Sequence, residues 1–134
     1  MNKENKLVPG LPSGFEDRWE NKLLLKKKLL KAIENNFIKF GAEPLETPSF
    51  EISENIGSFL AEDEANPMSD VFSFQDGEKS ITLRYDLSSP LARFVAQNNQ
   101  ELPSIFKRYQ IQNVFRNEKA GNGRYREFMQ ADFD

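Results

Sequence analysis

The side chains best suited to chemistry lie in the last part of the chain, from Phe115 to Asp134. Arginines stand on either side of a glycine-containing stretch, residues 119–123, and acidic and amide side chains follow it. Glycine and asparagine tolerate the positive φ that hairpin loops need, so the segment is predicted to be two strands joined by a turn. A planar guanidinium can bridge two phosphate oxygens, and carboxylates accept hydrogen bonds from an ammonium. The set therefore suits the binding of a nucleotide phosphate and an amino acid side by side.

Side chains alternate between two faces along the second predicted strand, because successive strand residues point to opposite sides of a sheet. The polar face carries Arg124, Arg126, Phe128, Gln130, Asp132 and Asp134. The apolar face carries Tyr125, Met129, Ala131 and Phe133, with Glu127 as the exception. In the preceding strand one parity is shared by Arg108, Gln110, Gln112 and Arg116. The alternative is an ordinary amphipathic hairpin with a solvated polar face, which is common.

Composition excludes several other kinds of chemistry. The chain has 134 residues, of which 38% are hydrophobic, enough for the core of one domain. It contains no cysteine and no histidine, which excludes disulfides, thiolate metal sites and Ser-His or Cys-His catalysis by these residues. A net charge of −3 argues against a general nucleic-acid binder. No apolar run is long enough to span a bilayer and no signal-like segment opens the chain, so a cytoplasmic location is expected.

The elements that must position these side chains begin with a long helix. It is predicted from about Asp17 to Phe40, and Gly41 stands where a left-handed C-terminal cap belongs. Its apolar stripe at helical spacing consists of Trp19, Leu23, Leu30, Ile33 and Phe37. Residues 26–28 are three lysines that could form a nucleic-acid patch, but the solvated side of the helix is the preferred interpretation.

An extended segment is predicted over residues 42–48, where prolines would keep it at a sheet edge or an interface. A short helix is expected from Ile52 to Leu60, followed by a loop over residues 61–67. The stretches 71–74 and 80–84 are a candidate strand pair around a Asp-Gly turn.

A further helix is predicted to open at Ser88-Ser89-Pro90, with a hydroxyl cap and proline in its first turn, and to run to about Gln97. Helices early and two long strands late predict an α+β fold, an antiparallel sheet flanked by helices. Residues 1–16 are expected to be an irregular N-terminal segment and residues 17–134 one domain.

Three blocks in this order resemble class II aminoacyl-tRNA synthetases and, within them, the histidyl-tRNA synthetases. Residues 41–50 resemble motif 1, which forms the dimer interface of the class. Residues 83–93, Leu-Arg-Tyr-Asp-Leu-Ser-Ser-Pro-Leu-Ala-Arg, resemble the loop that holds the amino acid, and residues 115–134 resemble motif 2, the hairpin that holds ATP. The first block alone is a weak signal, whereas the second and third together are specific. The resemblance covers the chain from Gly10 to its end.

The resemblance implies roles for residues that match the family pattern. Arg116 corresponds to the catalytic motif 2 arginine that contacts the α-phosphate of ATP and the substrate carboxylate. Glu118 corresponds to the glutamate near the adenine amino group, and Arg124 to the second arginine on the phosphate side.

At the amino-acid end, Asp86, Ser88 and Gln130 match the positions that bind the α-amino group of histidine. Asp134 matches the acidic position that meets the imidazole. Asp86 and Ser88 differ from the Glu and Thr of one common bacterial pattern, but they keep the charge and the hydroxyl. Arg-Tyr-Asp at residues 84–86 is similar to the eukaryotic-like branch of the family.

The implied function is that of a histidine–tRNA ligase, with ATP as substrate, Mg²⁺ expected beside it, and histidine and tRNA-His as the other substrates. The parent protein is expected to be a homodimer through the motif 1 region. Motif 3 and the anticodon-binding domain would lie beyond Asp134, so the chain is expected to be an N-terminal fragment that is inactive alone.

Two other functions remain open. One is the inactive paralogue that serves as a regulatory subunit of ATP phosphoribosyltransferase in histidine biosynthesis. The synthetase is favoured over it by the retention of Asp86, Arg116, Arg124, Gln130 and Asp134. The other is a free-standing nucleotide-binding or dimerisation module of this length.

Overall fold

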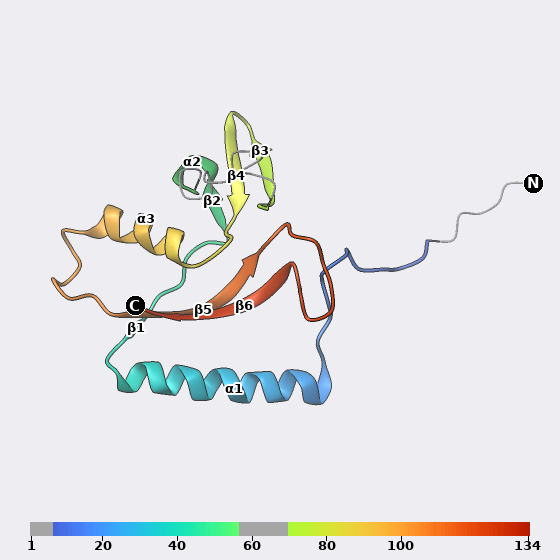
Figure 1. Cartoon of the computed structure of the whole chain (residues 1–134). Coiled ribbons are helices and arrows are strands. Elements are labelled where there is room, and N and C mark those ends of the chain that lie inside the picture. The colour runs from blue at the N-terminus through green and yellow to red at the C-terminus, as the bar shows by residue number, and fades with distance from the viewer. Residues whose placement is uncertain (1–6, 57–69) are drawn as a thin grey trace, which may run out of the picture.

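The computed structural model describes residues 7–56 and 70–134, in which two three-stranded sheets are flanked by helices (Figure 1). The elements in chain order are α1 (Glu20–Lys39), β1 (Glu43–Pro44), β2 (Phe50–Ile52), α2 (Ser53–Ile56), β3 (Ser73–Asp76), β4 (Lys79–Leu83), α3 (Ser88–Asn98), β5 (Arg108–Phe115) and β6 (Glu127–Phe133). The predicted α+β fold, with antiparallel strands flanked by helices, is confirmed.

The sheet that carries the polar residues has the strand order β1-β5-β6. β5 and β6 form the predicted antiparallel hairpin, in which Gln110 faces Asp132 and Gln112 faces Gln130. β1 runs parallel to β5 and lies at the edge of this sheet, where the prolines of residues 42–48 were expected to keep it. The alternating sequence of β5 and β6 thus gives one polar face and one apolar face.

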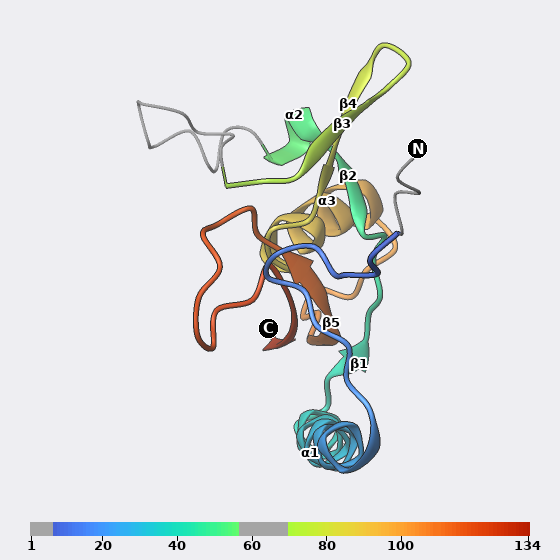
Figure 2. The same ribbon diagram turned by 90° about the vertical axis from the view of Figure 1, so that its right-hand side faces the viewer.

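Helix α1 covers the apolar face, as the side-by-side position of α1 and the sheet in Figure 1 indicates. The ring of Phe37 lies 5.9 Å from that of Tyr109 and 5.4 Å from that of Phe133, measured between centroids. The hydroxyl of Tyr109 also donates to Glu34 at 3.2 Å. Helix α3 lies on the opposite side of the sheet from α1, and Figure 2 shows the same order from a second direction. The polar face therefore lies on the side of the sheet where α3 is found.

A buried polar network joins the segment after β1 to the centre of this sheet. Gln110 Nε2 donates to Thr47 Oγ1 at 2.8 Å, and the backbone N–H of Thr47 donates to Gln112 Oε1 at 3.0 Å. Arg84 Nη1 donates to the carbonyl of Thr47 at 2.7 Å, while its Nε donates to the carbonyl of Asn113 at 2.6 Å. Thr47, Arg84 and Gln110 are all buried. The network holds three distant parts of the chain in one register.

The second sheet, of order β2-β4-β3, stands beside α2 and α3 (Figure 1). Its strand pair β3–β4 is the predicted one, with each strand shifted by one or two residues. Glu51 of β2 is buried and forms a forked ion pair with Arg93 of α3, at 2.8 Å from Arg93 Nε. This pair fixes α3 against the second sheet.

Several predicted boundaries were wrong. Helix α1 starts at Glu20 rather than Asp17, and Trp19 precedes it in extended conformation with 65% of its surface exposed. The rest of the predicted stripe is half-buried, and Gly41 has the expected positive φ of 77°. β2 ends at Ile52, so the helix expected from there starts one residue later, at Ser53. Its predicted part over residues 57–60, and the loop over 61–67, lie outside the described residues.

Two other corrections concern the polar residues directly. β6 begins at Glu127, so Arg124 and Arg126 lie in the turn region and not on the strand. The N-terminus of α3 lacks the expected hydroxyl cap. A carboxylate takes that place, since the backbone N–H of Ser89 donates to Asp86 Oδ1 at 3.1 Å.

Candidate active site

Arg116 follows β5 directly, and two aromatic rings hold its guanidinium. The Cζ atom lies 4.3 Å from the centroid of the Tyr85 ring and 5.0 Å from that of Phe128. Arg116 Nε also donates to the carbonyl of Tyr85 at 3.3 Å. Cation–π attraction to both rings restricts the rotation of the planar fork. Arg116 is therefore a preoriented cation at the end of the polar face.

Glu118 and Arg124 meet across the turn. Both Nε and Nη2 of Arg124 pair with Glu118 Oε2, and the hydroxyl of Tyr85 donates to Glu118 Oε1 at 2.7 Å. The hydrogen bonds from Tyr85 and Arg124 hold the pKa of the Glu118 carboxyl below its usual value. Burial, together with this hydrogen bond to Glu118, raises the pKa of Tyr85. The carboxylate is thus kept ionised and fixed from two sides.

These side chains enclose a pocket of about 390 Å³. Its lining consists of Arg116, Glu118, Gly123, Arg124, Tyr125 and Phe128. Two guanidiniums suit phosphate oxygens, a fixed carboxylate suits an amino group, and the aromatic rings offer flat apolar surface. The structure therefore brings together all three residues predicted for ATP.

The other end of the polar face is organised around Arg108. Its side chain is 1% exposed, and its Nη2 lies 3.0 Å from Asp134 Oδ2 and 3.8 Å from Asp132 Oδ2. Gln130 Nε2 donates to both carboxylate oxygens of Asp132 at 3.0 Å. Gln130 and Asp134, predicted for histidine, are therefore connected through Asp132 and Arg108.

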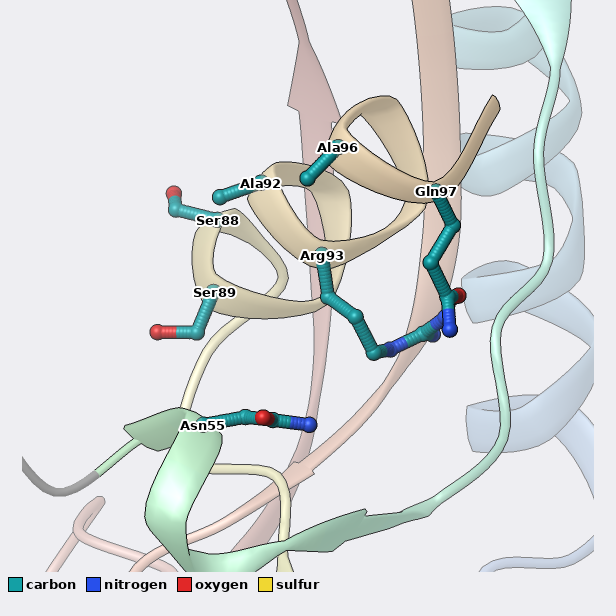
Figure 3. Close-up of a pocket in the computed structure, with 7 residues that line it drawn as sticks. All are labelled: Asn55, Ser88, Ser89, Ala92, Arg93, Ala96 and Gln97. Atoms are coloured by element: carbon teal, nitrogen blue, oxygen red, sulfur yellow. The ribbon is translucent and has the colours of Figure 1, made fainter. Parts of the chain in front are cut away.

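The loop before α3 meets the same arginine, because Arg108 Nη2 donates to the carbonyl of Leu87 at 3.3 Å. Leu87 lies between the two other residues predicted for histidine. Asp86 caps α3, and Ser88 is exposed. Ser88 lines a different pocket, of about 730 Å³, where Figure 3 shows it on the first turn of α3 with Asn55 on the neighbouring element. The structure thus ties the loop to the polar face but places Ser88 in a separate hollow.

For three residues that take part in the site, the sequence predicted no binding role. Arg108 and Asp132 were placed on the polar face by alternation alone, and that parity was the available signal. Tyr85 was part of the matched loop, but its contacts with Arg116 and Glu118 join positions about thirty residues apart along the chain. No local pattern predicts such a contact.

Arg126 is directed away from the pocket and anchors the N-terminal segment. Its guanidinium lies 4.7 Å from the centroid of the Phe72 ring and donates to Asn117 Oδ1. Its backbone N–H donates to the carbonyl of Gly14 at 2.8 Å. Gly14 has a φ of 82°, and a Cβ there would lie 2.5 Å from Arg126 Cγ. Only glycine fits this crossing without strain.

None of the helices in the described residues, 7–56 and 70–134, is long and apolar enough to cross a membrane. The same residues also contain no cluster of three or more His, Cys, Asp or Glu side chains that could hold a metal ion.

Curated relatives of the chain are histidine–tRNA ligases. It is 78% identical over 134 residues to that of Pelagibacter ubique (strain HTCC1062), matching 100% of this chain and 29% of the relative. It is 44% identical over 133 residues to that of Rhodopseudomonas palustris (strain BisB18), matching 98% of this chain and 25% of the relative. The chain therefore spans only 25–29% of the length of these relatives.

Solved structures have the same fold. Histidyl-tRNA synthetase from Nostoc sp. PCC 7120 superposes with a TM-score of 0.76 at 28% identity, over 92% of this chain and 28% of that chain. An ATP phosphoribosyltransferase regulatory subunit/histidyl-tRNA synthetase from Bacillus halodurans C superposes with a TM-score of 0.78, over 99% of this chain and 33% of that chain. The second pair is 23% identical, so this likeness concerns the fold alone.

The family itself follows from a match over most of the sequence. Residues 16–133 match the tRNA synthetases class II core domain (F). This range includes the first two blocks from which the resemblance was inferred and all of the third except its last residue, Asp134. It also contains the pocket and the loop before α3. The chain belongs to the class II tRNA synthetases, and residues 16–133 are part of their core domain.

Proposed function

We propose that this chain is the part of a histidine–tRNA ligase that binds ATP and histidine. The observation that carries the proposal is the pairing of two sites on one hairpin. A cationic pocket lies at its turn, and a carboxylate and amide surface lies at the other end of its polar face. The 78% identity to a histidine–tRNA ligase supports the same function.

At the ATP end, the α-phosphate would meet Arg116, whose fork two rings already orient. Glu118 would accept from the adenine amino group, and Arg124 would contact the phosphate side. Formation of an aminoacyl adenylate requires the carboxylate of the amino acid to attack the α-phosphate and expel pyrophosphate. No protein nucleophile is needed, so positioning and stabilisation of charge on the phosphoryl oxygens would supply the catalysis.

At the histidine end, Gln130 and Asp86 would bind the α-amino group, and Asp134 would accept from the imidazole. Gln130 and Asp134 are four residues apart on one strand, which is about 13 Å at the usual rise per residue. They would therefore serve opposite ends of a substrate lying along the strand. Ser88 completes the proposed set by its position in the matched loop, although its side chain lines the pocket beside α2.

Mg²⁺ would accompany ATP and offset the negative charge of its phosphates. We place the reaction in the cytoplasm, where ATP and tRNA-His are available. The competing function is that of the paralogous regulatory subunit. An assay of catalysis distinguishes the two functions.

The decisive experiment uses a chimaera in which residues 1–134 of this chain replace the matched segment of the Pelagibacter ubique ligase. We expect it to support histidine-dependent exchange of pyrophosphate into ATP and to charge tRNA-His. The unaltered ligase is the control for the assay. A folded chimaera that binds histidine without any exchange would contradict the ligase function and favour a regulatory role.

We also propose that the motif 1 region, around Pro48, lies at a two-fold interface. Nearby, Phe50 and Phe74 stack edge to face with 5.3 Å between centroids, yet they are 55% and 42% exposed. Exposed aromatic pairs of this kind are typical of surfaces that become buried on association. The chimaera should sediment as a dimer at micromolar concentration, and Phe50→Glu should shift it towards monomer. A chimaera that sediments as a monomer would show that this region is misassigned.

A further inference from the structure

Arg108 is a buried cation whose pairing is incomplete. The whole residue has 0% relative exposure. Its Nη2 donates to the carbonyl of Leu87 and forms ion pairs with the carboxylates of Asp132 and Asp134. Its Nε and Nη1 have no hydrogen-bond partner among the described residues. Burying a charge is costly, and a hydrophobic side chain in such a place is often neutral or stabilising. Stability alone is therefore a poor reason for an arginine here.

The contacts of Nη2 suggest what the arginine does. Arg108 and Asp134 are directly opposite each other, and their backbones exchange two hydrogen bonds, of 2.7 Å and 3.0 Å. Arg108 Nη2 lies 3.0 Å from Asp134 Oδ2, and the side chain of Arg108 is 1% exposed. The cation thus fixes one oxygen of the carboxylate from the buried side.

Asp132 fixes the orientation of the Gln130 side-chain amide. An ionised carboxylate can only accept hydrogen bonds, so Gln130 must turn its NH₂ group towards Asp132. The amide oxygen then points the other way, as an acceptor. An acceptor is what an α-ammonium group requires, and the opposite orientation of the amide would repel it.

We infer that Arg108 and Asp132 form a positioning pair for the histidine site, in which Arg108 fixes Asp134 and the Leu87 loop, and Asp132 fixes the amide of Gln130. The inference rests on the proposed function, since it concerns the same substrate. Neither member of the pair needs to touch histidine. Their effect should therefore appear in histidine affinity and not in ATP affinity.

The first test is Arg108→Lys in the chimaera, which keeps the charge but replaces the planar fork by a single ammonium group. The Michaelis constant for histidine and the inhibition constant of histidinol, which keeps the ring and the amino group, should both rise about tenfold, the loss expected for one charged hydrogen bond. The Michaelis constant for ATP should change by less than about twofold, within the ordinary effect of a distant substitution.

The matched control is Tyr109→Phe. Tyr109 is the next residue of β5 and is also buried, but its hydroxyl donates to Glu34 on the face that packs against α1. The variant should lower the thermal midpoint and leave the Michaelis constant for histidine unchanged. This comparison separates loss of stability from loss of positioning.

A second variant leaves the side chain of Arg108 unchanged. Asp132, 20% exposed, can be replaced by alanine, which frees the amide of Gln130 to rotate. Asp132→Ala should weaken histidine binding about tenfold, again one charged hydrogen bond. It should leave inhibition by imidazolelactate, which has a hydroxyl in place of the ammonium, unchanged.

The outcomes are distinguishable. Equal rises in the Michaelis constants for histidine and ATP in folded Arg108→Lys, or no rise for histidine, would overturn the positioning role of Arg108. Equal weakening of histidine and imidazolelactate in Asp132→Ala would overturn the orienting of Gln130. A folded but inactive parent chimaera would instead overturn the proposed function, and the histidine role of the pair with it.

Discussion

Asp134 and Arg116 stand at opposite ends of one polar face, so their replacement should damage different steps. Asp134→Asn keeps the shape but removes the charge that favours a ring N–H donor. We expect a loss of about 1–3 kcal/mol in kcat/KM for histidine with the Michaelis constant for ATP unchanged. Arg116→Lys should instead lower kcat, because it loses the bidentate grip on phosphate. Pyrophosphate exchange with each substrate varied checks both. If Asp134→Asn impaired ATP binding and histidine activation equally, the assignment of Asp134 to the histidine end would be wrong.

The ionisation of Glu118 should make stability depend on pH. Its folded-state pKa is lowered from an ordinary value of 4.5 by Tyr85 and Arg124, so its stabilising contribution is complete above that value. The contribution is lost as the pH falls through 4.5 towards the lowered pKa. Thermal unfolding of the chimaera and its Glu118→Gln variant between neutral and acidic pH should show a gap that narrows on acidification. A gap that widens on acidification would mean that the carboxylate is not stabilised in the folded state.

Among the elements, the N-terminal segment depends on a single glycine. Gly14→Ala would place a Cβ 2.5 Å from Arg126 Cγ at a φ of 82°. The strain should destabilise the protein by about 1–3 kcal/mol, seen as a lower thermal midpoint of the chimaera. Gly10→Ala is the matched control, because a Cβ at Gly10 would meet nothing within 4 Å. Equal midpoints for the two variants would show that the crossing of Gly14 and Arg126 is not maintained in solution.

The elements also show which parts of the fold the sequence could predict. Periodicity predicted α1 and the β5–β6 hairpin, because one buried face leaves a regular pattern. The β3–β4 pair was predicted from its Asp-Gly turn, and α3 from the Ser-Ser-Pro sequence at its start. The start of β6 was wrong, since contacts with Gly14 and Phe72 draw Arg126 out of the strand. The cap of α3 was wrong because Asp86 is as good an acceptor as a serine hydroxyl.

The candidate site was predictable as far as it follows from matched motifs and alternation. Arg116, Glu118 and Arg124 were expected together, and they line one pocket. The rings around Arg116 and the ion pairs of Arg108 depend on tertiary packing between distant segments, which a pattern along the chain does not contain.

For the whole molecule, the chain taken alone should be a poor catalyst. The pocket at the turn is lined by hairpin residues only, with no contribution from a second wall among the described residues. We expect the isolated 134 residues to show no aminoacylation and at most trace pyrophosphate exchange. The assay is the one used for the chimaera, which serves as the positive control. Turnover by the isolated chain comparable to that of the chimaera would contradict this.

The surfaces of the described residues also favour association of the isolated chain. β6 pairs on one side only, and α1 leaves Leu25 and Leu29 70% and 60% exposed. An unpaired strand edge and exposed leucines are routes to non-native contacts. Light scattering should therefore report aggregates, whereas monodisperse material with cooperative unfolding would speak against this expectation.

The network of Thr47, Gln110, Gln112 and Arg84 acts as a check on strand assembly. A slip of β5 by one residue would turn both glutamines towards α1 and bring Tyr109 and Ile111 to the polar side. Thr47 would then be buried without its hydrogen bonds to Gln110 and Gln112, and Arg84 without its hydrogen bond to Gln112. Apolar contacts alone would not impose such a cost. A purely apolar contact would tolerate a shift of β5 by one residue, whereas this polar network disfavours it. The same amides contribute little to net stability, but they permit a single register of β5. In that register, residues 108–116 place their charged side chains on one face of the sheet.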